Sequence, residues 1–453
     1  MTRGKIKFSF GASLKNFTIE SLRLKENYEE HCKEIASIFA NMTSSDFGFG
    51  WLSLPYSKTD EIKKIASRLK GYDSVIQIGI GGSALGNLML KEMFCGVYPN
   101  EKSTEFPKFY VADNPDPDKI NELWSLVKDV KTALIVVSKS GNTAETMSQF
   151  LWFLDKFERE NKNIQDSIVI ITDENNGVLR RFVEETSCDS LVIPESVGGR
   201  YSVLSAVGLL SASILGIDID ALLLGAKEMK EKLESSFSIE NNPAWFLASL
   251  CLYHDKIGRP MLVTMPYSSN MSYFSEWYAQ LWGESLGKKF RGTTPVRALG
   301  AIDQHSQIQL YTQGPDDKFF IIFTVETKKT LLSIPLSKRK SLLPLSYMSG
   351  CDFGNLLNLE AFSSAASIAK AGKPVVLINI PELSPQFVGE LIFFCEYLTA
   401  FVGYLMGINP FDQPGVEQGK NYTYGLLRRE GYNAEEQEAS QWSSLISQNE
   451  IYI

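Results

Sequence analysis

Two loops rich in glycine and hydroxyl side chains each follow an apolar, strand-like run. The first, Gly79-Ile-Gly-Gly-Ser-Ala84, ends a run that begins at Ser74, and the second, Ser138-Lys-Ser-Gly-Asn-Thr143, follows Ala133–Val137. A helical pattern comes directly after each loop. Backbone N–H groups and hydroxyls should therefore gather at a helix N-terminus, which is a favourable place for an anion.

The first loop alone leaves the kind of anion open. It fits the dinucleotide pattern G-x-G-x-x-A, and Asp113 stands at the end of the next predicted strand, where a dehydrogenase places an acid on the ribose. The same loop would also serve as a tight turn that lets strand and helix pack closely.

The second loop favours a single phosphate group. Two such helix N-termini at the carboxyl edge of one sheet can converge on one phosphate, and charge-assisted hydrogen bonds there contribute about 1.5–3 kcal/mol each. A nicotinamide site has no need of a second loop, and the G-x-x-x-x-G-K-[ST] pattern is absent. An ordinary helix cap remains the alternative for this loop. The candidate hydroxyl donors are Ser83, Ser138, Ser140 and Thr143.

Glu284 is the candidate general base. It ends the predicted helix Met271–Glu284 and continues a stripe made of Tyr273, Trp277 and Leu281. A carboxylate on such a face is costly unless it is paired or reactive, and partial desolvation suits a base. The alternative is a structural pair with Lys288 or Lys289. Glu396, on another apolar helix, is assigned a structural role because no glycine-rich loop adjoins it.

Cations and histidines give further candidates. Arg200 and Lys420 each follow glycines, where a ligand can approach closely, so a ligand-facing position is favoured over a surface one. His305 lies in the polar stretch Asp303–Gln307, and a loop histidine in a hydrogen-bonded turn is the alternative. His254, at a predicted helix end, is expected to cap that helix or to be solvated.

The elements that position these residues alternate between strand and helix patterns. The predicted strands of the first series are Ser74–Ile80, Phe109–Ala112, Ala133–Val137, Ser167–Thr172 and Leu191–Ile193. A second series has strands Met261–Met265, Phe319–Val325 and Pro374–Ile380, and then a buried helix over Leu391–Gly407. This alternation predicts an α/β protein with parallel, doubly wound sheets.

Four parts follow from this order. We expect an N-terminal helical extension (residues 1–55, with a helix over Ile19–Asn41), a first α/β unit (56–217), a second α/β unit (218–420) and a helical tail (421–453). The two units should join near Asp218–Asn242. The apolar stretch Leu391–Ile408 could nearly span a bilayer, but a buried core helix is favoured because no second span or basic flank accompanies it.

The composition argues against several classes of protein. A net charge of −8 and a pI near 5.3 argue against nucleic-acid binding, and the run Lys338-Arg339-Lys340 is expected to be a solvated loop. The six cysteines are scattered singly, which suggests neither a zinc site nor a disulfide framework and fits a reducing cytoplasm. The first eight residues carry no apolar signal segment, so a cytoplasmic protein without metal or membrane partner is expected.

Six motifs follow one another along the chain: Ile78–Gly86, Ser138–Thr146, Gly198–Ser202, Gly283–Lys288, Asp303–Gln307 and Asp412–Lys420. In sequence and order they resemble the motifs of the glucose-6-phosphate isomerases, and specifically those of the compact bacterial branch. The resemblance implies two αβα-sandwich sugar-isomerase subdomains with mainly parallel sheets, and a homodimer with shared active sites. It also implies isomerisation of glucose 6-phosphate to fructose 6-phosphate without cofactor or metal, through a cis-enediol.

The resemblance also implies roles for the matching residues. Glu284 would move the proton between C1 and C2, Arg200 would stabilise the enediolate, and His305 and Lys420 would assist ring opening. The histidine would enter from the neighbouring subunit. The residues expected to bind the substrate are Gly82, Ser83, Ser138, Lys139, Ser140, Thr143, Glu145 and Gln413.

The chain departs from the longer animal-type enzymes in two motifs. Ser140-Gly-Asn142 stands where those enzymes carry Thr-Phe-Thr, and Pro414 replaces a tryptophan. These changes leave the phosphate contacts of residues 140–143 and the use of mannose 6-phosphate open. Two other functions stay as alternatives: a non-catalytic phosphosugar sensor of the same fold, which would need the phosphate loops but not the catalytic set, and a nicotinamide-dependent dehydrogenase.

Overall fold

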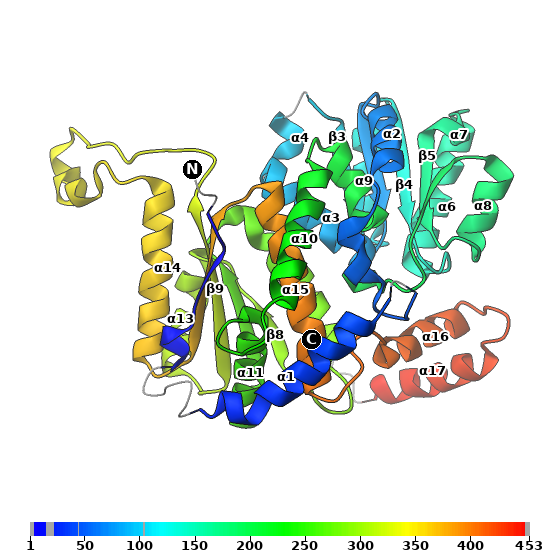
Figure 1. The fold of residues 1–453 in the computed structure, drawn as a ribbon. Helices are drawn as coiled ribbons and strands as arrows, with labels where there is room; N and C mark the ends of the chain where they lie inside the picture. The colour runs from blue at the N-terminus through cyan, green and yellow to red at the C-terminus, as the bar shows by residue number, and fades with distance from the viewer. Residues whose placement is uncertain (1–3, 15–21, 44, 103–104, 449–453) are drawn as a thin grey trace.

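Two five-stranded sheets form the frame of the molecule (Figure 1). The computed structural model describes residues 4–14, 22–43, 45–102 and 105–448. The first sheet has the order β3-β2-β4-β5-β6 and is parallel throughout. Its strands are β2 (Ser74–Ile78), β3 (Lys108–Ala112), β4 (Thr132–Val137), β5 (Ile168–Thr172) and β6 (Asp189–Val192).

The second sheet has the order β1-β10-β9-β7-β8. Its strands are β1 (Lys7–Ser9), β7 (Met261–Pro266), β8 (Thr294–Arg297), β9 (Lys318–Thr327) and β10 (Val375–Glu382). All neighbours are parallel except β1, which pairs antiparallel with β10. The predicted α/β class with mainly parallel sheets is confirmed. Sequence patterns missed both edge strands of this sheet, because short edge strands lack the long apolar run of a strand buried on both faces.

Both sheets wind in the same way. In the first, β2 continues to β3 on one side while β4 and β5 extend to the other side; in the second, β7 continues to β8 while β9 and β10 extend to the other side. In each sheet the direction in which successive strands are added therefore reverses once. The reversal lies between β2 and β4 in the first sheet and between β7 and β9 in the second. Open α/β sheets bind ligands outside the carboxyl ends of the strands at such a point.

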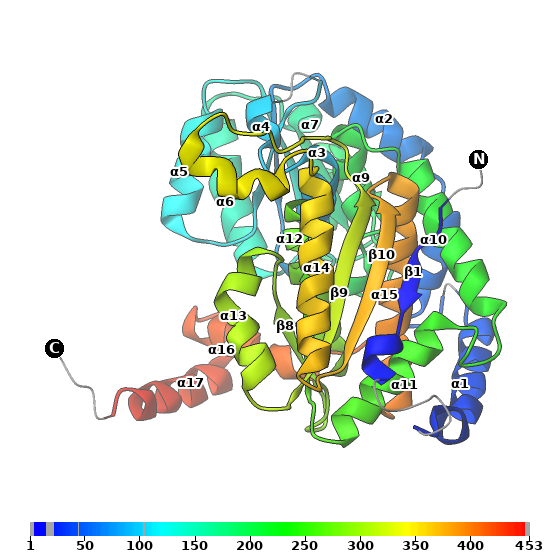
Figure 2. The ribbon, with the colours of Figure 1, turned by 90° about the vertical axis from the view of Figure 1, so that its left-hand side faces the viewer.

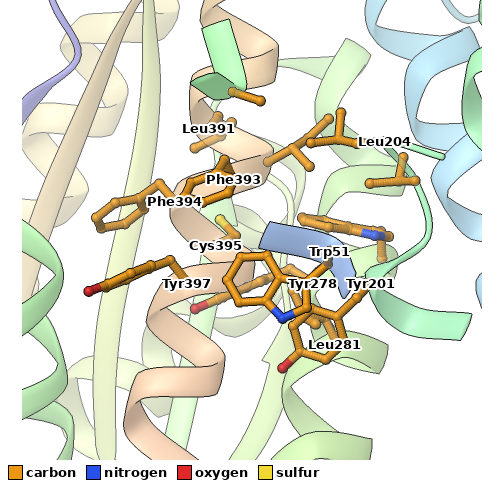
Figure 3. Packing of buried hydrophobic residues seen from close by; sticks show 14 of the residues in the cluster. Trp51, Tyr201, Leu204, Tyr278, Leu281, Leu391, Phe393, Phe394, Cys395 and Tyr397 are labelled. Atoms are coloured by element: carbon orange, nitrogen blue, oxygen red, sulfur yellow. The ribbon is translucent and has the colours of Figure 1, made fainter. Parts of the chain in front are cut away.

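A central layer of helices lies between the two sheets and is shared by both. It contains α2 (Asp60–Leu69), α3 (Leu85–Cys95), α9 (Ala206–Ile214), α10 (Ile219–Glu234), α11 (Pro243–Lys256), α12 (Ser272–Leu286) and α15 (Pro385–Leu405). The expected joint at residues 218–242 is mostly α10, which packs along α15 in this layer (Figure 1). Figure 3 shows Phe393 of α15 beside Trp51, which in turn lies against Tyr201, while Phe394 and Tyr397 point to the left of the helix in this view.

Outer helices cover the other face of each sheet. The first sheet is covered by α5 (Pro117–Val127), α6 (Ala144–Arg159), α7 (Ile164–Ser167) and α8 (Val178–Thr186). The second is covered by α13 (Ile302–Gln313) and α14 (Phe353–Lys370), as Figure 2 shows. Successive residues of a strand point to opposite faces, so Ile135 enters the shared core and Val136 the outer one.

Helix α15 is a core helix, as expected. It is long and apolar enough to cross a membrane, yet 83% of its apolar window is buried within the molecule. It begins at Pro385, six residues before the predicted start, because proline suits the first turn of a helix.

Further helices lie near both ends of the chain: α1 (Leu24–Asn41) near the N-terminus, and α16 (Glu417–Leu426) and α17 (Asn433–Ile446) near the C-terminus. Between α3 and β3, α4 (Pro99–Lys102) forms a single helical turn. Residues 19–21 of the predicted first helix lie outside the described residues. The residue boundaries of the four parts remain a prediction, and β1 shows that the N-terminal part also carries a strand.

Candidate active site

A cleft of about 820 Å³ opens at the carboxyl edge of the first sheet. It lies outside the point where the sheet reverses, between the loops that follow β2 and β4. Of the twelve site residues predicted from the sequence, eleven line this cleft and only His305 does not. Segments far apart in the chain meet here, from the β2 loop to α16.

The hydroxyls of the second loop are available to a ligand. Thr143 occupies the N-cap position of α6 but makes no side-chain capping bond. Its Oγ1 lies 3.2 Å from Oγ of Ser138, which is almost fully buried. The Ser140 hydroxyl accepts a hydrogen bond from the Asn142 N–H at 3.3 Å. The loop is therefore more than an ordinary helix cap, because its threonine hydroxyl is not used for capping.

Lys139 points to the neighbouring loop. Its ammonium donates to the carbonyl oxygens of Glu195 (2.6 Å) and Val197 (3.0 Å). Burial lowers the pKa of Lys139. The lysine thus ties the Ser138 loop to the segment that leads to Arg200, while it also lines the cleft.

Gly82 brings the first loop against the Arg200 segment. A Cβ atom at position 82 would lie 2.2 Å from the carbonyl oxygen of Gly199 and 3.0 Å from the Arg200 nitrogen. Only glycine permits this approach of two backbones. Ser83 follows directly, and its hydroxyl has no hydrogen-bond partner among the described residues, so it is available to a ligand.

Arg200 is the buried cation of the cleft, and only 4% of its surface is exposed. Its Nε donates to Ser285 Oγ at 2.8 Å, and its Nη2 donates to the carbonyl oxygens of Pro410 (2.5 Å) and Asp412 (2.8 Å). Its Nη1 donates to Gln413 Oε1 at 3.2 Å. These four acceptors fix the guanidinium in one position.

Glu284 lies beside this guanidinium, in the last turn of α12. Its Oε2 is 3.6 Å from Arg200 Nη1, and its side chain keeps 28% exposure. Gln280, one turn earlier, donates to Oε1 at 2.8 Å. The alternative pairing is not observed, because Lys288 pairs with Asp412 at 2.8 Å. Gln280 was not predicted from the sequence, although its i−4 spacing from Glu284 was a usable signal.

Helix α16 closes another side of the cleft. Lys420 is exposed and pairs with Glu417 at 3.0 Å. The Tyr424 hydroxyl donates to the Asn142 carbonyl at 2.9 Å, so α16 contacts the Ser138 loop. Glu145 and Gln413 complete the predicted set in the lining.

His254 and His305 both lie outside this cleft. His305 lies exposed on α13, so it is a helix residue and not a loop residue, and it does not reach the cleft of its own chain. The expectation for His254 is wrong: it is 3% exposed, stacks on Phe319 and contacts Arg259 through Nδ1 at 3.0 Å. Burial lowers the pKa of His254 to about 3. Within the described residues, no group of His, Cys, Asp or Glu side chains could hold a metal ion.

The chain is similar to known proteins over most of its length. The family model described as phosphoglucose isomerase matches residues 62–316 and 350–445. A glucose-6-phosphate isomerase of Carboxydothermus hydrogenoformans is 39% identical over 424 residues, covering 90% of this chain and 91% of that protein. One of Rubrobacter xylanophilus is 37% identical over 85% of this chain and 90% of that protein.

Solved structures share the fold. A hypothetical protein from Thermus thermophilus superposes with a TM-score of 0.83 at 33% identity, over 93% of this chain and 100% of that chain. A glucose-6-phosphate isomerase from Chlamydia trachomatis superposes with a TM-score of 0.81 at 22% identity, over 97% and 91%. The family model covers well over half of the sequence, and the relatives align along nearly their whole length. This chain belongs to the phosphoglucose isomerase family.

Proposed function

We propose that this chain interconverts glucose 6-phosphate and fructose 6-phosphate. The observation that carries the proposal is the Glu284–Arg200 pair, a carboxylate 3.6 Å from a buried guanidinium, in one cleft with two hydroxyl-rich loops at helix N-termini. The loops suit a phosphate monoester at one end of the sugar. The pair suits proton transfer next to a carbonyl at the other end.

The side chains divide the work as follows. Ser83, Ser138, Ser140 and Thr143 hold the phosphate, with Gly82 and Lys139 shaping their loops and with Glu145 and Gln413 lining the sugar site. Lys420 and His305 assist opening of the ring. Glu284 then takes the proton from C2 of the open aldose and returns it to C1, while O1 gains a proton and O2 loses one.

Arg200 stabilises the negative charge of the intermediate. Proton removal at C2 leaves an enediolate, whose negative charge develops on oxygen. A fixed cation beside the charged oxygen lowers the barrier to proton transfer, because the cation does not have to move during the reaction. Four acceptors already hold the guanidinium in place. Positioned proton transfer by Glu284 accounts for about 10²–10⁴ in rate.

The working unit in this proposal is a homodimer in which His305 acts in the partner's cleft. An arm formed by residues 328–352 projects from the second sheet (Figure 1) and carries exposed apolar side chains: Leu331, Leu332, Leu336, Leu342, Leu343, Leu345 and Tyr347. Lys338, Arg339 and Lys340 are also exposed on it. An apolar surface of this kind fits a second protein copy, and His305 is exposed on the outer layer that also carries α14.

The free cysteines support a place in the reducing cytoplasm.

The test is Glu284→Gln. We expect isomerase turnover to fall by about 10²–10⁴ while the affinity for fructose 6-phosphate stays within about tenfold, because the carboxylate acts mainly in the transition state. A coupled assay measures the first quantity and calorimetry the second. Glu276→Gln, at a partly exposed position of the same helix, is the control and should turn over normally.

Two results would contradict the proposal. Near-normal turnover in Glu284→Gln would remove the assignment of the base. Phosphosugar binding by the unaltered chain without any turnover would instead favour the non-catalytic sensor. The same assay with mannose 6-phosphate decides whether that sugar is accepted.

A further inference from the structure

A second cavity, of about 1030 Å³, opens at the carboxyl edge of the second sheet. It lies where β7 and β9 part, the place that corresponds by strand order to the cleft between β2 and β4. The loop after β7 contributes Ser268, Ser269 and Asn270, and the segment after β9 contributes Lys328. The cavity is separate from the cleft described above, because the two have no lining residue in common.

Lys328 is the feature that gives this cavity a chemical character. Its ammonium donates to the Tyr267 carbonyl oxygen at 3.2 Å and, within the described part of the chain, forms no ion pair. Its aliphatic stem lies against Gly354 at the start of α14, where an added Cβ would come within 2.7 Å of the lysine Cγ. A partly buried cation without a counter-ion is costly, and an anionic ligand would offset that cost.

The remaining walls define the rest of the ligand. Phe94, Phe106 and Leu383 supply apolar surface. The lining contains three acids: the carboxylate of Asp218 caps the N-terminus of α10, and Glu105 and Glu382 are exposed. The volume exceeds what a bare inorganic anion needs and is typical of small-molecule sites.

We propose that this cavity binds a phosphorylated small molecule, with the phosphate on Lys328 and the loop Ser268–Asn270. The lysine supplies the charge, and the serine hydroxyls and the asparagine amide supply neutral donors. The body of the ligand lies on the apolar wall. No catalytic step is assigned to this site.

Labelling with pyridoxal 5′-phosphate tests the proposal on the unaltered chain. Burial lowers the pKa of Lys328 to about 8, so at pH 8 a large fraction of its amine is neutral and can attack the aldehyde. Borohydride traps the product, and peptide mapping by mass spectrometry measures each lysine separately. This separates Lys328 from Lys139 and Lys420 of the first cleft.

The comparison with pyridoxal, which lacks the phosphate, isolates the contribution of the anion. Rates are normalised to Lys370, an exposed lysine at the far end of α14. We expect Lys328 to be labelled about tenfold faster by the phosphorylated reagent, because the donors of the loop Ser268–Asn270 hold its phosphate beside the reacting amine, and to be protected by inorganic phosphate. Equal normalised rates with the two reagents, or no protection by phosphate, would overturn the proposal.

A variant pair gives a second, independent readout. Calorimetry with inorganic phosphate measures the number of phosphate ions bound per chain. This number should be lower by one in Lys328→Met than in the unaltered chain, and it should be unchanged in Lys370→Met. Methionine preserves most of the stem against Gly354 and removes only the charge. An unchanged stoichiometry in folded Lys328→Met would also overturn the proposal.

Discussion

Arg200 illustrates what the local sequence can and cannot reveal about a single residue. The glycines before it favoured a ligand-facing arginine, and the structure places it in the cleft. Its acceptors on residues 410–413 lie more than 200 positions away in the chain, so no local pattern could identify them. For the same reason the alternative partners of Glu284, Lys288 or Lys289, were wrong: the observed partner comes from another segment.

His254 shows that the burial of a single residue is also hard to predict from its neighbours in the sequence. Its polar neighbours Tyr253, Asp255 and Lys256 suggested a solvated helix end. In the structure α11 packs its last turn against β9, so the imidazole stacks on Phe319 instead. Burial is decided by packing between distant elements, and a residue next to a helix end gives no information about it.

Glu396 allows a prediction about stability. It is fully buried in α15, and neither carboxylate oxygen has a hydrogen-bond partner among the described residues. Burial raises the pKa of Glu396 well above its usual value. The folded chain therefore keeps this carboxyl protonated, whereas the unfolded chain releases the proton above about pH 4.3.

Proton linkage gives the direction in which the stability of the folded chain changes with pH. Above about pH 4.3 the unfolded state binds fewer protons, so this group makes the folded state less stable as pH rises, by up to about 1.4 kcal/mol per pH unit. The stability of Glu396→Gln relative to the unaltered chain should therefore increase between pH 5 and 7. Urea unfolding at several pH values measures this, with the exposed Glu122→Gln as control. A constant difference across this range would contradict it.

At the scale of elements, the strands buried on both faces were the most predictable part. Each of the eight predicted strands is present, with ends shifted by one or a few residues. Continuous apolar runs bounded by turn residues mark such strands clearly. Strand β8, four residues with a proline and only partial burial, and β1, three residues long, carry no such signal.

The contact between the Gly82 loop and the Gly199 segment leads to a prediction at this scale. Gly82→Ala should force the two backbones apart and displace Arg200 and the Ser83 loop together. We expect a KM for fructose 6-phosphate raised by about tenfold or more and a lower kcat, because small misplacements of a site cost large factors in rate. Steady-state kinetics measure both.

A matched glycine controls for the loss of flexibility. A Cβ at Gly198 would have one neighbour, at 3.8 Å, which is an ordinary contact. Gly198→Ala should therefore leave KM within about twofold, since no backbone has to move. Similar kinetic losses in both variants would show that the close approach at Gly82 is not what matters.

For the whole molecule, the shared central layer explains why one cleft gathers distant segments. Helix α12 packs between the two sheets and delivers Glu284 to the edge of the first, while α16 brings Lys420 from the C-terminal part. Ordered motifs were enough to predict eleven of the residues that line this cleft. They could not predict the second cavity, because it depends on strand order, and Lys328 belongs to no recognised motif.

His305 remains outside the cleft of its own chain, and this leads to a prediction about assembly. If His305 acts in the partner's cleft, Glu284→Gln and His305→Ala chains, each inactive alone, should complement each other. In a mixed dimer one cleft combines both substitutions and the other combines none. Random reassociation of equal amounts makes half of the dimers mixed, so about a quarter of the unaltered activity should return.

The arm provides the control for this experiment. Leu343→Glu should place a charge on the apolar arm and weaken association, so the mixture should regain less activity when both chains carry it. Analytical ultracentrifugation measures the oligomer in parallel with the coupled assay. Absence of complementation in a mixture shown to contain mixed dimers would mean that His305 does not act across subunits. A histidine that serves the cleft of its own chain would leave every cleft in every dimer with one substitution, so no activity would return.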